Sequence, residues 1–434
     1  MQNRLKLAIR LIIQQIDQIQ QGVGTMLSRK LGSLARKFTF LFLCLTAIPF
    51  VIMIRLIRPW LLVRICGMQS SRIGHFAAEP ELYLCERDAG INKPKQRHLD
   101  LFFFKYRPIC NYQLASMWKR VLNIWPAWIL YPVATVNQLI PGGLIHDIIN
   151  TQRDRDIHNL YDRFPSNINF TDEEEAKGET ELRVIGIAPA ARFVCLIVRD
   201  SAYLKSQFKG SDFSYHNYRD CDIKNFLLVA DELTKYGYFV VRMGAKVHKP
   251  LVSDNPRIID YAYNGMRSDF MDIYLGAKCD FCISVGTGFD AIPTIFRKPI
   301  AYVNINPAGC LITFRKNVIG ILKHHFFTPD NRELTLKEIF SNGLGYCSFN
   351  SDYESKRVQL IENTPEEIRD VAVEMVERLN GSWTSWEDDE ILQETFWKIF
   401  PTDAMDIKRG KPMHGEIRSR FGASYLRNNR EWLK

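Results

Sequence analysis

The sequence predicts an α/β protein whose C-terminal half contains a doubly wound parallel sheet. Strands that are apolar throughout alternate with helices between residues 193 and 304, and such strands need helices on both faces. The 434 residues leave room for two or three domains, and the basic charge is concentrated at the N-terminus. We therefore divide the chain into an arm at 1–70, a first domain at 71–182, a second domain at 183–400 and a tail at 401–434, whose helix we expect to pack back on the body.

The N-terminal arm combines positive charge with an uncharged apolar run. Residues 1–78 contain eleven Lys or Arg and one acid, whereas the rest of the chain is close to neutral. Nucleic acid and anionic membranes both attract such an arm. Within it, Phe38 to Ile54 forms a run of seventeen residues without a charge, at the short limit for a membrane-spanning helix. We expect this segment to span, dip into or lie on an anionic membrane, and we expect no nucleic acid partner; a buried core helix is the alternative.

Apolar side chains ahead of this run recur at alternating spacings of four and three, which places them on one helical face. They are Leu5, Ile9, Ile12, Ile16, Ile19, Val23 and Met26. This face suits an oligomerising coiled coil through residues 5–26, an amphipathic surface helix, or packing against the rest of the chain.

The cysteines and the N-terminus indicate the cellular compartment. The apolar run begins too late for a signal peptide. Most of the ten cysteines lie among apolar neighbours, and the CxxC pair of Cys279 and Cys282 has no second pair to complete a zinc site. We expect buried, reduced thiols, no metal site, and a location on the cytoplasmic face of the inner membrane.

Short apolar runs separated by polar turns begin near residue 72. The clearest are a buried strand at 99–104 and a helix at 113–124. Residues 150–182 are rich in charge and turn residues, including four consecutive acids at 172–175. We interpret them as a solvated surface or linker at the domain boundary.

The second domain gives the clearest pattern. We expect strands at 193–198, 237–241, 257–262, 279–285 and 300–304, and helices at 225–236, 269–278, 289–296, 365–379 and 390–400. Asp222 is placed to cap the first of these helices, and Thr364 followed by Pro365 marks the start of the fourth. Because ligands of parallel sheets bind beyond the carboxyl ends of the strands, we expect the site there.

Polar, charged and glycine residues gather at these strand ends and helix starts. They are Arg199, Arg242, Gly244, Ser268, Asp269, Ser284, Gly286, Thr287, Gly288 and Asp290. Arginine offers a planar fork to phosphate oxygens, and a helix start with small residues lets backbone N–H groups approach a phosphate. Together these residues predict a diphosphate site. The alternatives are that the two arginines are surface ion-pair partners and that the Gly-Thr-Gly segment is a structural turn.

Several blocks of the chain resemble bacterial sugar transferases of the GT-B type. They are VRD at 198–200, YHNYRDCDI at 215–223, GYFVVRMG at 237–244, RSDFMDIYLGAKCDF at 267–281 and SVGTGFDAIPTIFRKP at 284–299. With RIGHFAAEPELYL at 72–84, LIENTPEEI at 360–368 and the end at 422–433, these blocks are similar to a family of bacterial glycosyltransferases associated with surface-polysaccharide synthesis. The resemblance covers about residues 70–434, and it takes residues 72–84 as a first strand and its loop.

The resemblance implies two Rossmann-like domains that face each other across a cleft. The second would hold a nucleotide-sugar through the residues named above, without a metal or a further cofactor, and the first would hold the acceptor. His75 follows the first strand in this comparison and is the candidate general base; the alternative is a histidine packed near the domain interface. Asp290 is a candidate for holding ribose or sugar hydroxyls, or it favours a helix N-terminus by its charge alone.

We therefore expect a metal-independent, hexosyl-type glycosyltransferase that moves a sugar from a nucleotide-sugar to a surface-glycan or lipid-linked acceptor. Two alternatives stay open: another nucleotide-sugar enzyme such as an epimerase, and a non-catalytic scaffold that binds a nucleotide-sugar. The segments 154–156 and 220–222 match the DxD pattern in form. We interpret them as surface and helix-cap residues and not as metal ligands.

Overall fold

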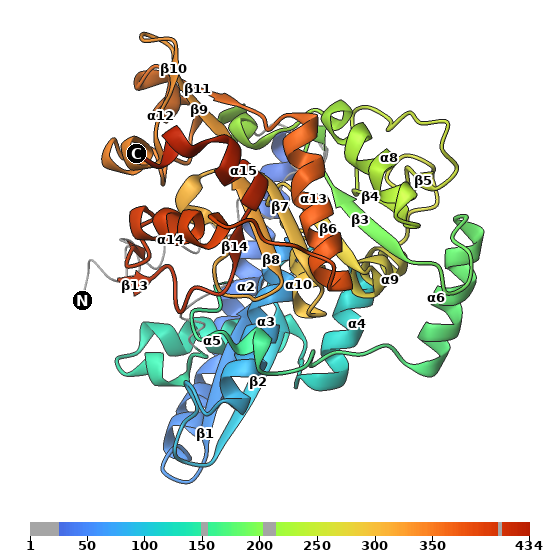
Figure 1. The fold of residues 1–434 in the computed structure, drawn as a ribbon. Helices are drawn as coiled ribbons and strands as arrows, with labels where there is room; N and C mark the ends of the chain where they lie inside the picture. Colours follow the sequence, from blue (N-terminus) through green and yellow to red (C-terminus); the bar gives the residue numbers. More distant parts are fainter. Residues whose placement is uncertain (1–25, 149–154, 203–213, 407–409) are drawn as a thin grey trace. The chain divides into compact units, whose positions relative to one another are not determined.

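The computed structural model describes residues 26–148, 155–202, 214–406 and 410–434 (Figure 1). The chain forms two compact units, Met1–Thr151 and Gln152–Lys434. This division lies before the boundary expected at 182, so the charged segment belongs to unit 2. Its four consecutive acids form the first turn of helix α6 (Asp172–Val184), which Thr171 caps, and they suit the positive end of the helix dipole. The apolar repeat at 5–26 lies outside the described residues, apart from Met26.

Unit 1 contains a small parallel sheet and several helices. Its elements are α2 (Met26–Leu56), β1 (Leu62–Met68), α3 (Ile73–Asp88), β2 (His98–Phe104), α4 (Tyr112–Val121), α5 (Ala127–Leu139) and the 3₁₀ turn η1 (Gly143–His146). β1 and β2 pair in parallel along their whole length. Single bridges from Ile65 to Asp147 and from Phe102 to Ile124 extend the pairing. The strand expected at 99–104 is confirmed as β2, and the helix expected at 113–124 is α4.

The first strand of unit 1 lies inside the segment that we assigned to the arm. In the sequence, Arg64 interrupts the apolar residues of β1. In the structure Asp100 of β2 neutralises it, with Nη2 2.6 Å from Oδ2 and Nε donating to Oδ1 at 2.7 Å. A charge that is paired and hydrogen-bonded can be buried. The boundary at residue 70 is therefore wrong, because β1 belongs to the body of unit 1.

The resemblance took residues 72–84 as a strand and its loop, but residues 73–88 form helix α3, with Pro80 inside it. Proline removes the N–H group that would bond the carbonyl four residues earlier. That carbonyl belongs to Phe76, and it accepts a hydrogen bond from Nε1 of Trp118 on α4 at 2.9 Å. Both aromatic side chains are fully buried. A tertiary hydrogen bond thus replaces the one that Pro80 removes.

Helix α2 presents one narrow face to the rest of unit 1. Ala47, Val51 and Ile54 of this face are buried in one hydrophobic cluster with residues of β1, β2 and α5. Those residues are Val63, Ile65, Phe103, Leu130, Val133 and Val136. Phe40 extends the face toward the N-terminus, where its ring lies 5.1 Å from that of Tyr131 on α5. The second half of α2 is therefore part of the core of unit 1.

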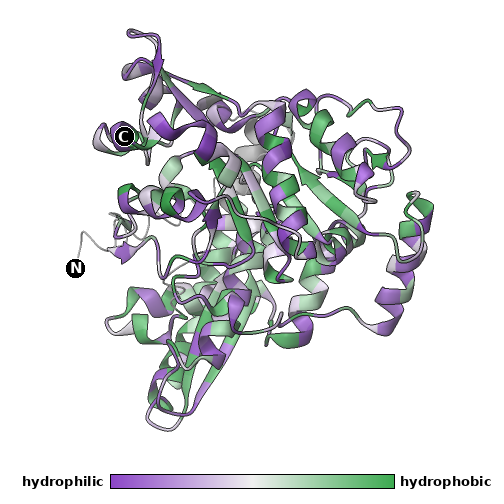
Figure 2. Cartoon of the chain, viewed as in Figure 1, coloured by the Kyte–Doolittle hydropathy of each residue, from purple (hydrophilic) through white to green (hydrophobic). Residues whose placement is uncertain are grey.

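Unit 2 is built on seven strands in the order β14-β8-β7-β6-β3-β4-β5. They are β3 (Phe193–Ile197), β4 (Phe239–Met243), β5 (Ile258–Ile259), β6 (Phe281–Ser284), β7 (Ile300–Ile305), β8 (Val318–Leu322) and β14 (Arg420–Phe421). Every neighbouring pair is parallel. The central strands are mostly hydrophobic (Figure 2), as burial on both faces requires. The predicted parallel sheet is confirmed.

Helices connect these strands on both faces of the sheet. α8 (Leu227–Lys235) links β3 to β4, whereas α9 (Asp269–Lys278) links β5 back to β6. The chain moves in opposite directions across the sheet in these two connections, and right-handed crossovers then place the helices on opposite faces. α13 (Pro365–Asn380) packs against α8, and α10 (Ala291–Ile295) packs against α9. The sheet is doubly wound, as predicted.

The remaining elements of unit 2 are short, apart from one helix. They are η3 (Ser214–Arg219), η4 (Ile223–Phe226), α11 (Leu336–Ser341), α12 (Asn350–Ser355), α14 (Asp389–Ile399), α15 (Ala423–Asn428), β9 (His324–Phe327), β10 (Arg332–Glu333), β11 (Val358–Ile361), β12 (Met405–Asp406) and β13 (Lys411–Pro412), with 3₁₀ turns at Leu160–Asp162, Ala308–Cys310 and Arg430–Leu433. In the tail, β14 joins the edge of the large sheet beside β8, and the ring of Phe421 stacks on Phe396 with centroids 4.1 Å apart.

Two helix starts read from the sequence have the expected caps. Asp222 accepts a hydrogen bond from the backbone N of Lys224 at the start of η4. Thr364 and Glu367 form a reciprocal capping box at α13, with Pro365 at the first helical position. Local sequence therefore determines where these helices begin.

Candidate functional site

The candidate site lies at the edge of the unit 2 sheet formed by the carboxyl ends of its parallel strands. Arg199 follows β3 and has 14% of its side chain exposed. Its Nε donates to Oδ1 of Asp220 at 3.0 Å, and its carbonyl accepts from the backbone N of Cys221 at 3.1 Å. The segment after η3 is thus held against the end of β3, where open parallel sheets bind their ligands.

Two further cations join Arg199 at this edge. Arg219, the last residue of η3, donates from Nη2 to the carbonyl of Gly286, which follows β6. Lys323 follows β8 and is buried, and its Nζ donates to the carbonyl of Asp220 at 2.8 Å. Residues 219 and 220 therefore connect the ends of β3, β6 and β8. We call Arg199, Arg219 and Lys323 the cation cluster.

The cation cluster contains three cations, one of which pairs with a carboxylate. Asp220 is the one carboxylate hydrogen-bonded to it among the described residues. Burial lowers the pKa of Arg199, and the neighbouring charge of Arg219 lowers it further. Nε of Arg219 is buried and has no hydrogen-bond partner in the described part of the chain. Like charges placed together in a partly buried site are typical of an anion-binding site.

The side chain of Asp290 stabilises the Gly-Thr-Gly turn after β6. The carboxylate of Asp290 accepts from Ser284 Oγ at 3.0 Å and from the backbone N of Thr287 at 3.0 Å. Gly286 has a left-handed φ of 73°, which favours glycine. The helix that follows, α10, has five residues and not the eight expected. Its dipole is correspondingly weak, and Asp290 serves the turn through these two bonds.

Arg242 has different surroundings from Arg199. It is 2% exposed, its Nη1 donates to the carbonyl of Lys249 at 2.6 Å, and it pairs with Asp260 at 3.3 Å. Asp260 also accepts from the backbone N of Leu251 at 2.6 Å. Arg242 thus holds the segment between β4 and β5, and the structure does not bring it into the cation cluster.

The other predicted donor residues near β4 and β5 have local roles. Gly244 follows β4, and a Cβ at this position would lie 3.0 Å from Val247. Ser268 caps α9 by accepting from the backbone N of Met271, and Asp269 lies in the first turn, 3.7 Å from Arg267. These contacts are all local to the segments around β4, β5 and α9.

His75 lies in unit 1, in the first turn of α3 and shortly after β1. Its Nδ1 is 3.0 Å from Oε1 of Glu79, one turn further along the helix, and its side chain is 25% exposed. Burial, together with the carboxylate of Glu79, raises the pKa of Cys66 to about 12, so Glu79 lies near the end of β1. A second histidine of unit 1, His146, is buried, and its Nδ1 lies 2.7 Å from the carbonyl oxygen of Val63.

The aspartates described in the two DxD-like segments make contacts within the protein. Asp220 pairs with Arg199, and Asp222 caps η4. Asp156 is buried and accepts from the backbone N of Tyr161 at 2.7 Å, whereas Asp154 lies outside the described residues. The described part of the chain contains no group of three His, Cys, Asp or Glu side chains that could hold a metal ion.

Sequence reasoning missed two members of the cation cluster. Arg219 lies in the block YHNYRDCDI at 215–223, but no strand end precedes it directly. Lys323 follows VIGIL, which is an apolar run of the same kind as the predicted strands, and we did not predict that strand. The apolar run before Lys323 could have identified that residue from the sequence. Arg219 could not be found in this way, because a loop carries it across the sheet to Gly286.

No protein-family model and no curated protein matches this chain. Among solved structures, the chain is similar to the ADP-heptose lipopolysaccharide heptosyltransferase II of E. coli, at 12% identity and a TM-score of 0.34, over 60% of this chain and 89% of that chain. It is also similar to a family 9 glycosyl transferase from Veillonella parvula, at 12% identity and a TM-score of 0.41, over 73% and 97%. Scores of this size do not establish a shared fold or activity.

Proposed function

We propose that unit 2 binds the diphosphate of a nucleotide-sugar at the cation cluster and that the protein is a glycosyltransferase. The observation that carries the proposal is the convergence of Arg199, Arg219 and Lys323 from three segments on one sheet edge, with Asp220 as the paired acid. A diphosphate supplies negative charge for the three cations and acceptors for N–H groups such as Nε of Arg219. The step from anion binding to glycosyl transfer rests on the sequence resemblance.

The chemistry proposed for the cluster is stabilisation of the leaving group. When the bond from the sugar to the diphosphate breaks, negative charge grows on the leaving diphosphate oxygen. Cations that are fixed before the reaction stabilise this charge at little reorganisation cost. Arg199 is fixed by Asp220, and Arg219 by the carbonyl of Gly286. Their role is therefore both to bind the donor and to lower the barrier.

Aromatic side chains beside the cluster favour a nucleoside. Tyr215 and His216 of η3 lie close to Phe349, with Tyr215 and Phe349 centroids 5.4 Å apart. Phe349 is 49% exposed. Exposed aromatic rings near a phosphate site offer a base a face to stack on, so we place the base of the donor at Phe349.

His75 is the proposed base that takes the proton from the acceptor hydroxyl. Nδ1 lies 3.0 Å from Oε1 of Glu79, and histidine is the side chain that most often serves as a general base. Replacing His75 with Asn should then reduce turnover strongly and leave nucleotide-sugar affinity unchanged. A variant that turns over like the wild type would exclude His75 from this role.

The decisive experiment measures nucleotide-sugar binding and nucleotide release. Calorimetry should detect binding of at least one of UDP-, GDP- or ADP-linked sugars, and weaker binding of a CMP-linked sugar, which lacks the diphosphate. Arg219→Gln should weaken this binding by roughly 1.5–3 kcal/mol, the contribution of a charge-assisted hydrogen bond. Arg242→Met is the matched control, whose folded fraction should bind as the wild type does.

The alternatives predict different products in the same assay. A glycosyltransferase releases the nucleoside diphosphate in the presence of an acceptor. An epimerase returns an isomeric nucleotide-sugar, and a scaffold binds without turnover. If Arg219→Gln binds every nucleotide-sugar as tightly as the wild type, the cation cluster is not the donor site.

We also propose that α2 attaches the protein to an anionic membrane. The segment Lys37–Leu56 is 20 residues long and apolar enough to cross a membrane by length and composition, and 17% of it is buried. Its exposed apolar side chains are Phe38, Leu41, Phe42, Leu45, Ile48, Phe50, Ile52, Met53 and Leu56. A helix that is apolar on all sides needs a nonpolar environment around it.

The packing of α2 favours a helix that lies in the membrane surface. Unit 1 covers one face of α2 from Phe40 to Ile54. A helix crossing the bilayer would therefore carry β1, with the ion pair of Arg64 and Asp100, into the hydrocarbon region. An in-plane helix keeps this face on the protein and immerses the other. We propose the cytoplasmic face of the inner membrane, where a lipid-linked or surface-glycan acceptor would be met.

Vesicle flotation tests the membrane proposal. The full chain should float with anionic vesicles, and the triple variant Leu41→Ser, Phe42→Ser, Leu45→Ser should not. The matched control is Trp386→Ser, which removes an exposed aromatic side chain from unit 2. Full-length protein that stays in the soluble fraction at low salt would contradict membrane attachment.

A further inference from the structure

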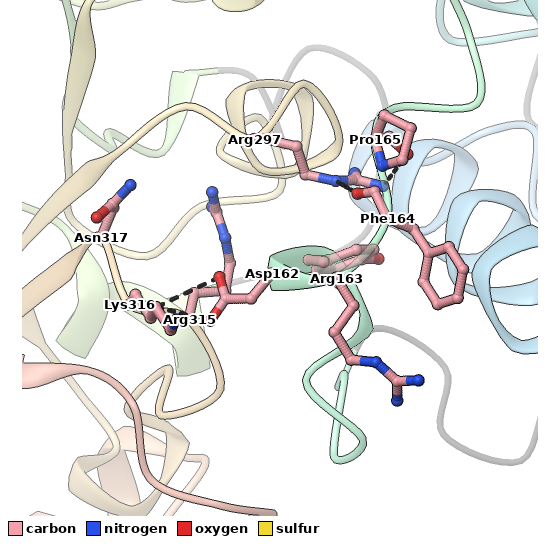
Figure 3. A pocket seen from close by; sticks show the side chains of 9 residues that line it. Asp162, Arg163, Phe164, Pro165, Arg297, Arg315, Lys316 and Asn317 are labelled. Carbon is pink, nitrogen blue, oxygen red and sulfur yellow. Dashed lines mark hydrogen bonds between the residues drawn. The ribbon is translucent and has the colours of Figure 1, made fainter. Parts of the chain in front are cut away.

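A cationic pocket lies at the opposite edge of the unit 2 sheet. It has a volume of about 380 Å³ and is lined by Tyr161, Asp162, Arg163, Phe164, Pro165, Arg297, Arg315, Lys316 and Asn317. Residues 315–317 directly precede β8, and Arg297 precedes β7. Because the strands are parallel, this edge is separated from the cation cluster by the length of the sheet. The pocket is a second site within unit 2 (Figure 3).

Arg315 is the unusual residue of this pocket. Its side chain is 2% exposed, and one of its N–H groups is used, with Nη2 donating to the carbonyl of Lys298 at 3.0 Å. Nε and Nη1 are buried and have no hydrogen-bond partner among the described residues. In Figure 3 the guanidinium lies between Asn317 and Arg297. A buried arginine with unused donors is costly unless an acceptor is supplied.

The protein itself does not supply enough acid to this pocket. Four cations line it, and Asp162 is the one acid in the lining. Asp162 is already engaged, because it accepts from the backbone N of Lys316 at 3.1 Å and pairs with Arg418 at 3.4 Å. Burial lowers the pKa of Arg315, and the charge of Arg297 lowers it further. The positive charge of Arg315 therefore has no full counterpart in the described chain.

The remaining cations differ in how freely they can serve a ligand. Arg297 is committed to the protein, since it donates to the carbonyls of Phe164 at 2.9 Å and Pro165 at 2.7 Å. Arg163 and Lys316 are exposed. The pocket thus has one buried cation with unused donors at its wall and two exposed cations at its rim, which attract an anion and leave room for more than the anion alone.

We propose that this pocket binds a phosphate-class oxyanion, either free phosphate or the phosphate of a monoester, with Arg315 as its main ligand. A tetrahedral dianion offers several acceptor oxygens and balances the surplus charge, which a monoanion does less well. The site is distinct from the cation cluster, and the proposal does not depend on the glycosyltransferase assignment.

Thermal unfolding of the full chain tests this site through two comparisons of the melting temperatures of the wild type and a variant, one without phosphate and one with it. In phosphate-free buffer, Arg315→Met should melt at or above the temperature of the wild type, because it removes an uncompensated buried charge and keeps the apolar stem. At constant ionic strength, inorganic phosphate should raise the melting temperature of the wild type and leave that of Arg315→Met unchanged. Glycerol 3-phosphate in a parallel titration distinguishes a monoester site from a free phosphate site by the lower half-saturating concentration.

Two control variants test whether the response of the melting temperature to phosphate arises at Arg315. Arg219→Gln should keep the response to phosphate at Arg315, and Arg332→Met, an exposed arginine paired with Glu338, should keep it as well. The proposal is overturned if phosphate does not stabilise the wild type, or if chloride at equal ionic strength stabilises it as much. It is also overturned if Arg315→Met responds like the wild type, or if Arg219→Gln alone loses the response.

Discussion

Two arginines at similar positions in the sequence have opposite surroundings in the structure. Arg199 and Arg242 both stand at carboxyl ends of neighbouring strands, and the same reasoning assigned both to a diphosphate. Arg199 belongs to the cation cluster, whereas the segment between β4 and β5 encloses Arg242. The difference arises from that segment, whose Asp260 and Lys249 carbonyl both accept hydrogen bonds from Nη1 of Arg242. A position at a strand end places an arginine near a site but does not leave it accessible.

The buried position of Arg242 predicts a stability effect. Arg242→Met leaves Asp260 without its cation, and breaking a buried pair from one side should reduce the free energy of unfolding by about 3–5 kcal/mol. Urea denaturation followed by circular dichroism measures this loss. A loss below about 1 kcal/mol, the usual scale for a surface pair, would show that Asp260 is well solvated without Arg242.

Adjacent histidines in unit 2 respond to pH in opposite ways. Burial alone would lower the pKa of His324, but the carboxylates of Glu333 and Glu367 outweigh it and raise the pKa to about 10 from an ordinary value of 6.5. Burial lowers the pKa of the neighbouring His325 to about 4. His324 is therefore charged in the folded protein at neutral pH, and His325 is neutral.

This difference predicts how stability depends on pH. A raised folded pKa gives stability that is complete below pH 6.5 and is lost as the pH rises toward 10, by about 1.4 kcal/mol per pH unit. His324→Gln should reduce this slope between pH 7.5 and about 9.5, in denaturation curves compared with the wild type. Parallel slopes for the two proteins would mean that Glu333 and Glu367 do not hold the proton on His324.

At the scale of an element, helix α2 has one buried face and one exposed face. Its stripe of Ala47, Val51 and Ile54 belongs to the core of unit 1, whereas most of its remaining circumference is apolar and exposed. The sequence pattern of an uncharged run indicates a nonpolar environment without saying which side faces protein. Residues 1–70, which we set apart as an arm from the sequence, include β1 and one wall of the core of unit 1, so these elements are part of its folded body.

The core face of α2 predicts the effect of two changes. A chain starting at Gln69 lacks β1 and should fail to show a cooperative unfolding transition for unit 1. Ile54→Ala, at a position 7% exposed, should destabilise unit 1 by about 2–5 kcal/mol, as buried large-to-small changes do. Phe42→Ala is the matched control on the exposed face and should have little effect on the melting curve. Equal effects of the two single changes would mean that α2 does not pack as described.

At the scale of the whole molecule, the chain divides into units with separate cores. The main hydrophobic cluster of unit 2 contains residues from Ile185 to Leu433, and the cluster that includes α2 contains residues from Ala47 to Val136. The start of unit 2 is also tied to its own end, since Arg155 donates to the carbonyl of Met413 at 2.5 Å. Each unit thus contains the contacts that its fold requires.

This division predicts that unit 2 folds alone. A fragment beginning at Gln152 should unfold cooperatively in calorimetry and keep the wild-type affinity for nucleotide-sugar and for phosphate. A fragment that lacks near-UV circular dichroism would contradict the independence of unit 2. A folded fragment that has lost nucleotide-sugar affinity would instead show that unit 1 contributes to binding of the donor.

The sequence by itself determined the class of unit 2 and the starts of its helices. Continuous apolar strands predicted the parallel sheet because burial on both faces leaves that pattern in the sequence, and Thr364 with Pro365 located a helix start because capping is local. It also identified residues 38–54 as an uncharged apolar segment, part of which packs in the core of unit 1. The same local reasoning predicts that Arg199 and the turn at 286–288 follow the carboxyl ends of strands, and the structure has both at the ends of β3 and β6.

Only the tertiary structure decided the features that depend on partners distant in the sequence. The ion pair with Asp100 allows the residues around Arg64 to form a buried strand. The hydrogen bond from Trp118 to the carbonyl of Phe76 allows a helix to continue through Pro80. A loop carries Arg219 across the sheet to Gly286, and burial leaves Arg315 without a full set of partners. In each case the outcome depends on whether a charge or a carbonyl finds a partner, and that is determined by the fold and not by the neighbouring residues.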